Sequence, residues 1–273
     1  MIGGDRGSGS LVWMALLAAL FMGLRACDRP LAPVDAGGVP LDWQATVPDD
    51  PGADFAAPPE TRRIELPGGE QLHEGQVAEA LAAAGHARTW SSFTWQVEDA
   101  PVTTIAPGLD RRHHFANAYL VGYVPFAQVE AWVPLAALAQ RKRYQFDHEQ
   151  YPGAPELWQT SREAFFHPRG DCEDHALALA DWLIGLGHDA RVVIGTMRGG
   201  GHAWVVLFDG PRTYLLEATD KRPARALPLA SQLPDYRPEA MFNREQYWVN
   251  SGSPLTTDYR GERWQPRSRF RRG

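Results

Sequence analysis

The chain has 273 residues, of which 44% are hydrophobic and 11% aromatic, and this composition excludes a fibrous or wholly disordered protein. The formal net charge of −6 argues against nucleic acid as the main partner. A chain of this kind can bury one substantial core, so we expect a single domain preceded by a non-globular N-terminus.

The first 27 residues are typical of a targeting segment. Residues 11–24, LVWMALLAALFMGL, are fewer than the ~20 of a membrane span but suit the hydrophobic region of an export signal. Residues 24–27, LRAC, resemble the lipobox of bacterial lipoproteins, in which the cysteine is lipidated; an uncleaved signal anchor is the alternative. Either interpretation of residues 1–27 predicts a membrane-anchored protein of the periplasm or cell envelope.

Composition divides the rest of the chain into three parts. Residues 28–70 contain repeated prolines and no sustained apolar period, which predicts a linker. We expect the folded domain at 71–258. Residues 259–273 are rich in arginine and predict a solvated basic tail, with contact to an anionic membrane or cell-wall polymer as the alternative.

The first part of the domain predicts short helices. Residues 76–84 have helical spacing, and residues 126–144 indicate helical pieces interrupted by Pro134. Thr160 and Glu163 have the spacing of a capping box, which predicts the start of another short helix.

The most informative stretch is GDCEDHA at 170–176. Asp171 is placed as an N-cap, and apolar residues then recur at helical spacing as far as Gly185, so Cys172 lies on the first turn of a buried helix. If Cys27 is lipidated or lies in a membrane segment, Cys172 has no disulfide partner. A free thiol in an oxidising compartment is better explained by chemistry than by packing.

Three strands are expected after this helix. Residues 191–197 are rich in β-formers, residues 199–201 are a glycine break, and the strands 202–208 and 213–217 flank a tight turn at 209–212. One helix followed by three strands predicts an α+β layer.

The register of this hairpin selects an acid for His202. If the turn centres on residues 210–211, Glu217 lies on the same face as His202, as a diagonal neighbour about 7–8 Å away at Cα. Asp220 would point to the other face. Glu217 is therefore the predicted partner, and a slip of one residue would reverse the choice.

Together these residues have the arrangement that activates a thiol. A helix N-terminus and a neighbouring imidazolium both lower the pKa of a cysteine. An acid that orients the histidine completes the set of nucleophile, base and orienting group. Cys172, His202 and Glu217 are the candidates for these three roles.

The motifs GDCEDHALALADWL, GHAWVVL and YLLEAT, within residues 157–220, resemble those of the transglutaminase-like superfamily. Within it they resemble the bacterial transglutaminase-like cysteine peptidases, which include periplasmic adhesin-cleaving proteases. The resemblance implies an α+β, papain-like fold with the nucleophile-bearing helix packed on an antiparallel sheet. It also implies Cys172 as nucleophile and His202 as general base. The third role falls on Glu217, where many relatives have Asp.

The segment LWQTSREAFF at 157–166 resembles the one that precedes the cysteine in this group. Gln159 and Trp158 are therefore candidates for holding an oxyanion, with a place in the core as the alternative. Other histidines lack metal-ligand companions at a recognisable spacing and are predicted surface residues: His113, His114 and His148.

The acids beside the cysteine pose an electrostatic problem. Asp171, Glu173 and Asp174 suit a helix N-terminus, but their charge should raise the pKa of the thiol unless something positive offsets it. The relatives with DCED imply a calcium site there. Arg169 stands where those relatives are expected to have another acid. We therefore favour a metal-free site in which Arg169, or His202 as imidazolium, offsets the acids, with Ca²⁺ as the alternative.

The sequence thus predicts a cell-envelope cysteine peptidase that acts on a peptide or protein substrate through a thioester, without a cofactor and without nucleic acid. One alternative is a transamidase that uses the same three residues. The other is a binding module of the same fold without catalysis.

Overall fold

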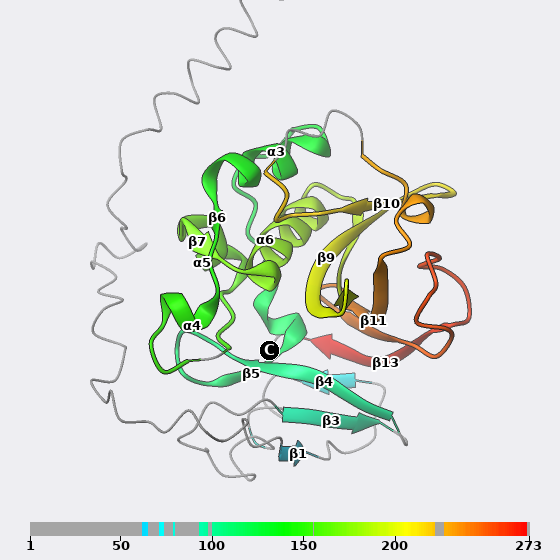
Figure 1. The fold of residues 1–273 in the computed structure, drawn as a ribbon, viewed down its shortest axis with the longest axis horizontal. Coiled ribbons are helices and arrows are strands. Elements are labelled where there is room, and N and C mark those ends of the chain that lie inside the picture. Colours follow the sequence, from blue (N-terminus) through cyan, green and yellow to red (C-terminus); the bar gives the residue numbers. More distant parts are fainter. Residues whose placement is uncertain are drawn as a thin grey trace, which may run out of the picture. The chain divides into compact units, whose positions relative to one another are not determined.

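The computed structural model describes residues 62–64, 71–73, 79, 93–97, 100–154, 156–221 and 227–271 (Figure 1). The predicted signal or anchor at 1–27 lies outside the described residues, as do most of the predicted linker and all but Glu79 of the helix expected at 76–84. The chain divides into two compact units, 1–46 and 47–273, and the described residues all belong to the second.

Among the described helices α6, with 14 residues, is the longest. In chain order the helices are η2 (Ala116–Tyr119), α3 (Trp132–Arg141), α4 (Asp147–Gln150), α5 (Ser161–Phe166), α6 (Cys172–Gly185) and η3 (Ala230–Gln232).

The described strands form three sheets. The largest has the order β10-β9-β8-β11-β12-β13-β2, and its neighbours are antiparallel except β13 and β2. A second sheet has the order β1-β3-β4-β5, and β6 pairs in parallel with β7. The strands are β1 (Arg62–Ile64), β2 (Gln71–His73), β3 (Phe93–Val97), β4 (Ala100–Pro107), β5 (His113–Phe115), β6 (Arg143–Tyr144), β7 (Arg169–Gly170), β8 (Asp189–Met197), β9 (Gly200–Asp209), β10 (Arg212–Leu216), β11 (Tyr236–Phe242), β12 (Gln246–Asn250) and β13 (Trp264–Arg271).

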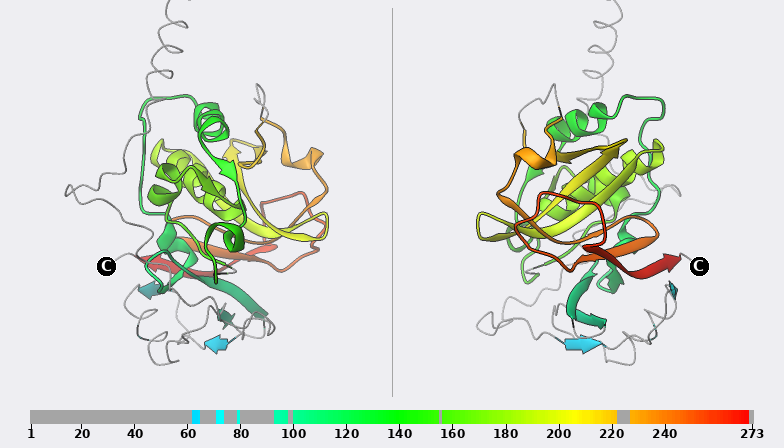
Figure 2. Two further views of the ribbon diagram at one scale, coloured as in Figure 1. Left: turned by 60° about the vertical axis from the view of Figure 1, so that its left-hand side comes forward. Right: turned by 90° about the vertical axis from the view of Figure 1, so that its right-hand side faces the viewer.

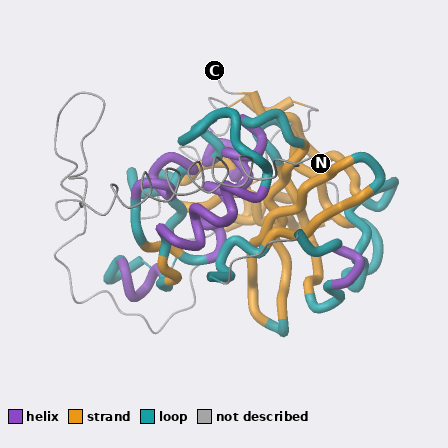
Figure 3. Tube along the Cα trace, turned by 90° about the horizontal axis from the view of Figure 1, so that it is seen from above, coloured by secondary structure: helices purple, strands orange, loops and turns teal. Residues whose placement is uncertain are grey.

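A helical layer covers one face of the large sheet. α6 packs on β8 and β9 and contacts α3 and α5, and these helices lie together on one side of the strands (Figures 2 and 3). Each large apolar side chain that is fully buried between these helices and the sheet stabilises the fold by about 1.5–3 kcal/mol. The α+β class and the antiparallel sheet predicted from the sequence are confirmed. The shared core includes Leu177, Leu179, Trp182, Val192 and Val205.

α6 begins at the predicted residue but without the predicted side-chain cap. Asp171 is the N-cap and has an extended backbone, yet its side chain makes no capping hydrogen bond. Its carboxyl group lies instead among other buried acids. The helix ends at Gly185, and Gly187, at φ +90°, has the left-handed backbone that glycine favours.

Pro134 does not interrupt a helix, contrary to the sequence prediction. α3 begins at Trp132, so Pro134 is its third residue. The N–H groups of the first helical turn have no acceptor within the helix, and a proline there therefore removes no helical hydrogen bond.

The described part of the predicted basic tail, residues 259–271, does not form a solvated tail. β13 pairs with β12, and Tyr259, Trp264 and Phe270 are buried. Exposed arginines alternate with these apolar residues near the end of the strand, as at Arg269 and Arg271. The high arginine content therefore concealed the period of two that marks a strand.

Both hairpins of the central strands have tight turns. Arg198 and Gly199 have positive φ between β8 and β9, and the glycine break is therefore shorter than predicted, because Gly200 and Gly201 pair within the sheet. In the β9–β10 hairpin the partner of Asp209 is Arg212, which is the register expected from the sequence.

α5 begins with the predicted capping box. Glu163 donates its backbone N–H to Thr160 Oγ1 at 3.3 Å, and Thr160 donates its backbone N–H to Glu163 Oε2 at 2.8 Å. Two N–H groups that have no acceptor within the helix are thereby satisfied.

The substitution Thr160→Ala should lower the free energy of unfolding by about 0.5–2 kcal/mol, because the backbone N–H of Glu163 loses its acceptor. Urea unfolding followed by circular dichroism measures the change. Thr160→Ser keeps the hydroxyl and should retain most of the stability. An unchanged midpoint in Thr160→Ala would show that the capping box contributes nothing.

Candidate active site

His202 and Glu217 meet across the β9–β10 hairpin. His202 Nε2 lies 2.8 Å from Glu217 Oε2, and the two side chains are only 8% and 19% exposed. Because Nε2 is engaged with the carboxylate, Nδ1 is the ring nitrogen that remains to accept a proton. The structure therefore brings together the histidine and the acid that the hairpin register selected.

The carboxylate of Glu217 is held by four hydrogen bonds. Besides the bond to His202, Oε1 accepts from the backbone N–H and the hydroxyl of Thr219, at 2.9 and 2.7 Å, and Oε2 accepts from the hydroxyl of Tyr236 at 2.8 Å. Although burial acts to raise it, the bonds from His202 and Thr219 hold the pKa of Glu217 below its ordinary value. Tyr236 comes from β11, and no sequence pattern indicated its role.

Cys172 is the first residue of α6 and is partly buried. Its thiol donates to Glu173 Oε2 at 3.3 Å, and a backbone hydrogen bond from Ala203, the residue after His202, favours the thiolate. Burial and the charge of Asp171 nevertheless raise the pKa of Cys172 to about 12. In this arrangement the thiol is hydrogen-bonded to Glu173 and is not activated as a nucleophile.

Four buried carboxyl groups cluster around the start of α6. Three come from the GDCEDHA stretch, and the fourth, Asp147 of α4, was missed because nothing in the sequence links α4 to α6. One oxygen from each group lies within 4.8 Å of the others. Each group also has a buried oxygen without a hydrogen-bond partner: Asp147 Oδ1, Asp171 Oδ1, Glu173 Oε1 and Asp174 Oδ2.

Burial raises the pKa of all four carboxyl groups of this acidic cluster above their ordinary values. The charge of Asp171 raises the pKa of Asp147, Glu173 and Asp174 further. Buried carboxylates that repel one another need a positive partner in order to stay ionised.

Arg169 is not that partner, which corrects the sequence prediction. Its side chain is exposed and donates to Gln145 Oε1 at 3.1 Å. In the extended backbone of β7 successive side chains point to opposite faces, and it is the next residue, Gly170, that faces Asp174. His202 is likewise engaged elsewhere, with Glu217. The preference for a metal-free site therefore loses its basis.

A buried cation, Lys142, does act on these acids through its charge; its side chain is 2% exposed. Its charge acts to lower the pKa of Asp171 and Asp174, while burial lowers the pKa of Lys142 itself. A single positive charge cannot balance four ionised carboxylates, so the acidic cluster remains undercompensated. Its Nζ donates to the carbonyl oxygens of Ala164, His167 and Arg169, at 2.7, 3.1 and 3.2 Å.

Both oxyanion candidates lie in the core. Trp158 is 8% exposed, and its Nε1 donates to Glu156 Oε1 at 2.7 Å. Gln159 is fully buried, and its Nε2 donates to Tyr151 Oη and to the carbonyl oxygen of Arg169, both at 3.2 Å. This placement favours a structural role for both residues, and their oxyanion role stays a prediction.

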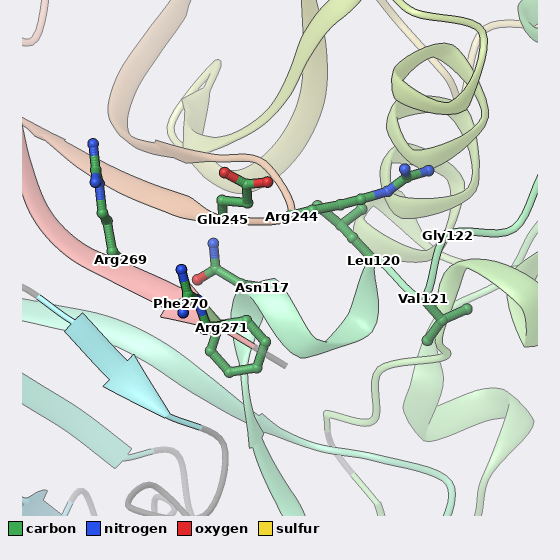
Figure 4. A pocket seen from close by; sticks show the side chains of 9 residues that line it. All are labelled: Asn117, Leu120, Val121, Gly122, Arg244, Glu245, Arg269, Phe270 and Arg271. Carbon is green, nitrogen blue, oxygen red and sulfur yellow. The ribbon is translucent and has the colours of Figure 1, made fainter. Parts of the chain in front are cut away.

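A cavity of about 430 Å³ near the β11–β12 turn contains none of the candidate residues (Figure 4). It is lined in part by Asn117, Arg244 and Arg269. Arg244 extends from the cavity toward α6, where its Nε donates to the buried carboxylate of Asp181 at 2.6 Å. This arginine therefore anchors the helix that carries Cys172.

Among solved structures, calcium-bound LapG of Legionella pneumophila is 20% identical to this chain, with a TM-score of 0.38. The similarity covers 46% of this chain and 73% of LapG. A score this low does not establish a shared fold, so the fold assignment rests on the elements described above.

Curated relatives include the centrosomal proteins of 76 kDa of Xenopus laevis and Homo sapiens, which are 41% and 40% identical over 73 residues. The match covers 26% of this chain, and the chain spans only 11% of the length of each relative. Because these relatives are centrosomal, they contradict the predicted location in the periplasm or cell envelope. Within the described part of the chain, no helix has the length and apolar character of a membrane span.

A family model described as the CEP76 peptidase-like domain matches residues 156–259. The range contains Cys172, His202 and Glu217, although the model names a centrosomal protein where the motifs resembled bacterial peptidases. The part of the chain that carries the candidate site is therefore similar to a peptidase-like domain.

Proposed function

We propose that this chain is a cysteine peptidase with a transglutaminase-like catalytic domain, which hydrolyses an amide bond of a peptide or protein. Cys172 is the nucleophile, His202 the general base and Glu217 the orienting acid. The observation that carries the proposal is the 2.8 Å bond between His202 and Glu217, formed on the strand against which the Cys172 helix packs.

The proposed reaction has two steps. The sulfur of Cys172 attacks the carbonyl carbon while Nδ1 of His202 takes the thiol proton; the C–N bond breaks, and the leaving amine receives that proton. Water then attacks the resulting thioester, and His202 accepts a proton from the water. The C–S bond breaks, the proton returns to sulfur, and a carboxylic acid is released.

The acidic cluster fits a hard cation. Ca²⁺ takes 6–8 oxygen ligands, and the four buried oxygens without partners are of this kind. We therefore propose that Asp147, Asp171, Glu173 and Asp174 hold Ca²⁺. When bound, the ion would compensate the negative charge beside the thiol. The relatives with DCED are expected to have a further acid at the position of Arg169. In this chain Asp147 takes the place of that acid in the proposed ligand set.

Iodoacetamide labelling of Cys172 at pH 7 in the presence of Ca²⁺ tests the catalytic assignment. Mass spectrometry separates the Cys172 peptide from that of Cys27. His202→Ala should slow labelling of Cys172 roughly tenfold, because the thiol loses its base. His188→Ala, a change of the same type on the loop after α6, should leave the rate unchanged. Equal rates in the wild type and His202→Ala would remove the proposal.

A further inference from the structure

Four rings form a continuous row that begins on α6. The ring of His175, one turn after Cys172, stacks on Tyr144 with a centroid distance of 6.3 Å. Tyr144 contacts Phe146 at 5.2 Å, and Phe146 stacks on His148 at 5.4 Å. His175 is fully buried, whereas Tyr144 and Phe146 are 41% and 48% exposed. The row thus runs from the core beside the nucleophile out to the surface.

Backbone pairing places this row next to Cys172. In the parallel pair of β6 and β7, the partner of Tyr144 is Gly170, two residues before Cys172. A side chain at Gly170 would collide with the carboxylate of Asp174, so β7 passes tightly against the start of α6. Burial raises the pKa of Tyr144, and the charge of Cys172 raises it further.

β6 also offers a strand edge. Arg143 and Gln145 donate their backbone N–H groups to Pro168 O and Gly170 O, at 2.7 and 3.0 Å. Because successive residues of a strand alternate their hydrogen-bonding direction, the backbone of Tyr144 faces the other edge. Within the described ranges β6 pairs only with β7. An extended peptide could therefore add to β6 as a further strand.

We propose that Tyr144 and Phe146 form a specificity wall, which receives an aromatic or large aliphatic side chain of an extended substrate close to the bond that is cleaved. This inference rests on the proposed function. In an extended peptide, side chains on one face repeat every ~6–7 Å, close to the ring spacing of 5.2–6.3 Å. Alternate substrate side chains would therefore meet successive rings, and apolar ones would gain from leaving water.

Peptidyl chloromethyl ketones test the wall, because the thiolate displaces chloride and forms a thioether on Cys172. The probes are acetyl-tetraalanine chloromethyl ketone and variants in which one alanine at a time is phenylalanine. At least one phenylalanine probe should label Cys172 roughly tenfold faster than the alanine probe. Phe146→Ala should abolish this preference by raising the inhibition constant KI, with the maximal inactivation rate and the iodoacetamide rate unchanged.

Phe166→Ala is the matched control. Phe166 is 53% exposed but lies on α5, where its ring contacts Tyr123 and Phe165, and the preference should survive its loss. Normal iodoacetamide labelling without any phenylalanine preference, or a preference that persists in Phe146→Ala, would overturn the wall alone. Absence of iodoacetamide labelling in the wild type would overturn the proposed function and the wall together.

Discussion

Ca²⁺ at about 100 times its dissociation constant should raise the melting temperature of chelator-treated protein by roughly 5–10 °C. The ion would bind the native state, in which four buried carboxyl groups have oxygens without partners. The unfolded chain does not hold these groups together, so binding stabilises the fold. Differential scanning calorimetry in excess chelator, and then with added Ca²⁺, measures the shift.

Two comparisons make this result specific. Asp147→Asn should reduce the shift, because it removes one of the four proposed carboxyl ligands, the one that only the fold brings to α6. Asp189→Asn, which changes a carboxylate outside the acidic cluster, should leave the shift intact. Mg²⁺ should stabilise less, because it is smaller and gives up its water reluctantly. A melting temperature indifferent to both chelator and Ca²⁺ would eliminate the calcium site.

Loss of the proposed catalytic base should have the largest effect on turnover. His202→Ala should lower hydrolysis of fluorogenic peptide amides by about 10²–10⁴-fold, the usual contribution of a positioned general base. Glu217→Gln should also lower turnover steeply. The amide NH₂ can take the place of the oxygen that faces His202 Nε2, and it would then rotate the imidazole ring or shift its proton from Nε2 to Nδ1.

Asp220→Asn is the natural control for Glu217→Gln, since it makes the same chemical change three residues along the chain. Its effect on turnover should be within a few-fold, because the bond to His202 comes from Glu217. If Asp220→Asn reduced turnover more than Glu217→Gln, the hydrogen-bonded acid seen here would not be the one that supports catalysis. Thermal melting of each variant separates a catalytic loss from unfolding.

The location predicted from the sequence is wrong. An apolar run and a four-residue pattern at 24–27 supported an export signal, but the centrosomal relatives contradict the cell-envelope location. Short apolar runs carry little specific information. The motifs that carry Cys172, His202 and Glu217, in contrast, combine a residue type with a position on a particular element, and the similarity to a peptidase-like domain covers them.

Sequence alone determined the features that depend on near neighbours in the chain. The start of α6, the capping box of α5 and the register of the β9–β10 hairpin follow from local turn and helix chemistry, and the pairing of His202 with Glu217 follows from that register. Each is confirmed as a structural element.

Only the tertiary structure decided which distant groups complete the site. Asp147 joins the acids of α6, Tyr236 holds Glu217, and Lys142 lies buried near the cluster in place of the exposed Arg169. The ring row reaches α6 through the pairing of β6 with β7. These groups come from separate elements, and no local periodicity records which elements will pack together. Packing of α4, β6 and β11 around α6 and β9 therefore set the surroundings of the candidate site, while local sequence placed Cys172, His202 and Glu217 on their elements.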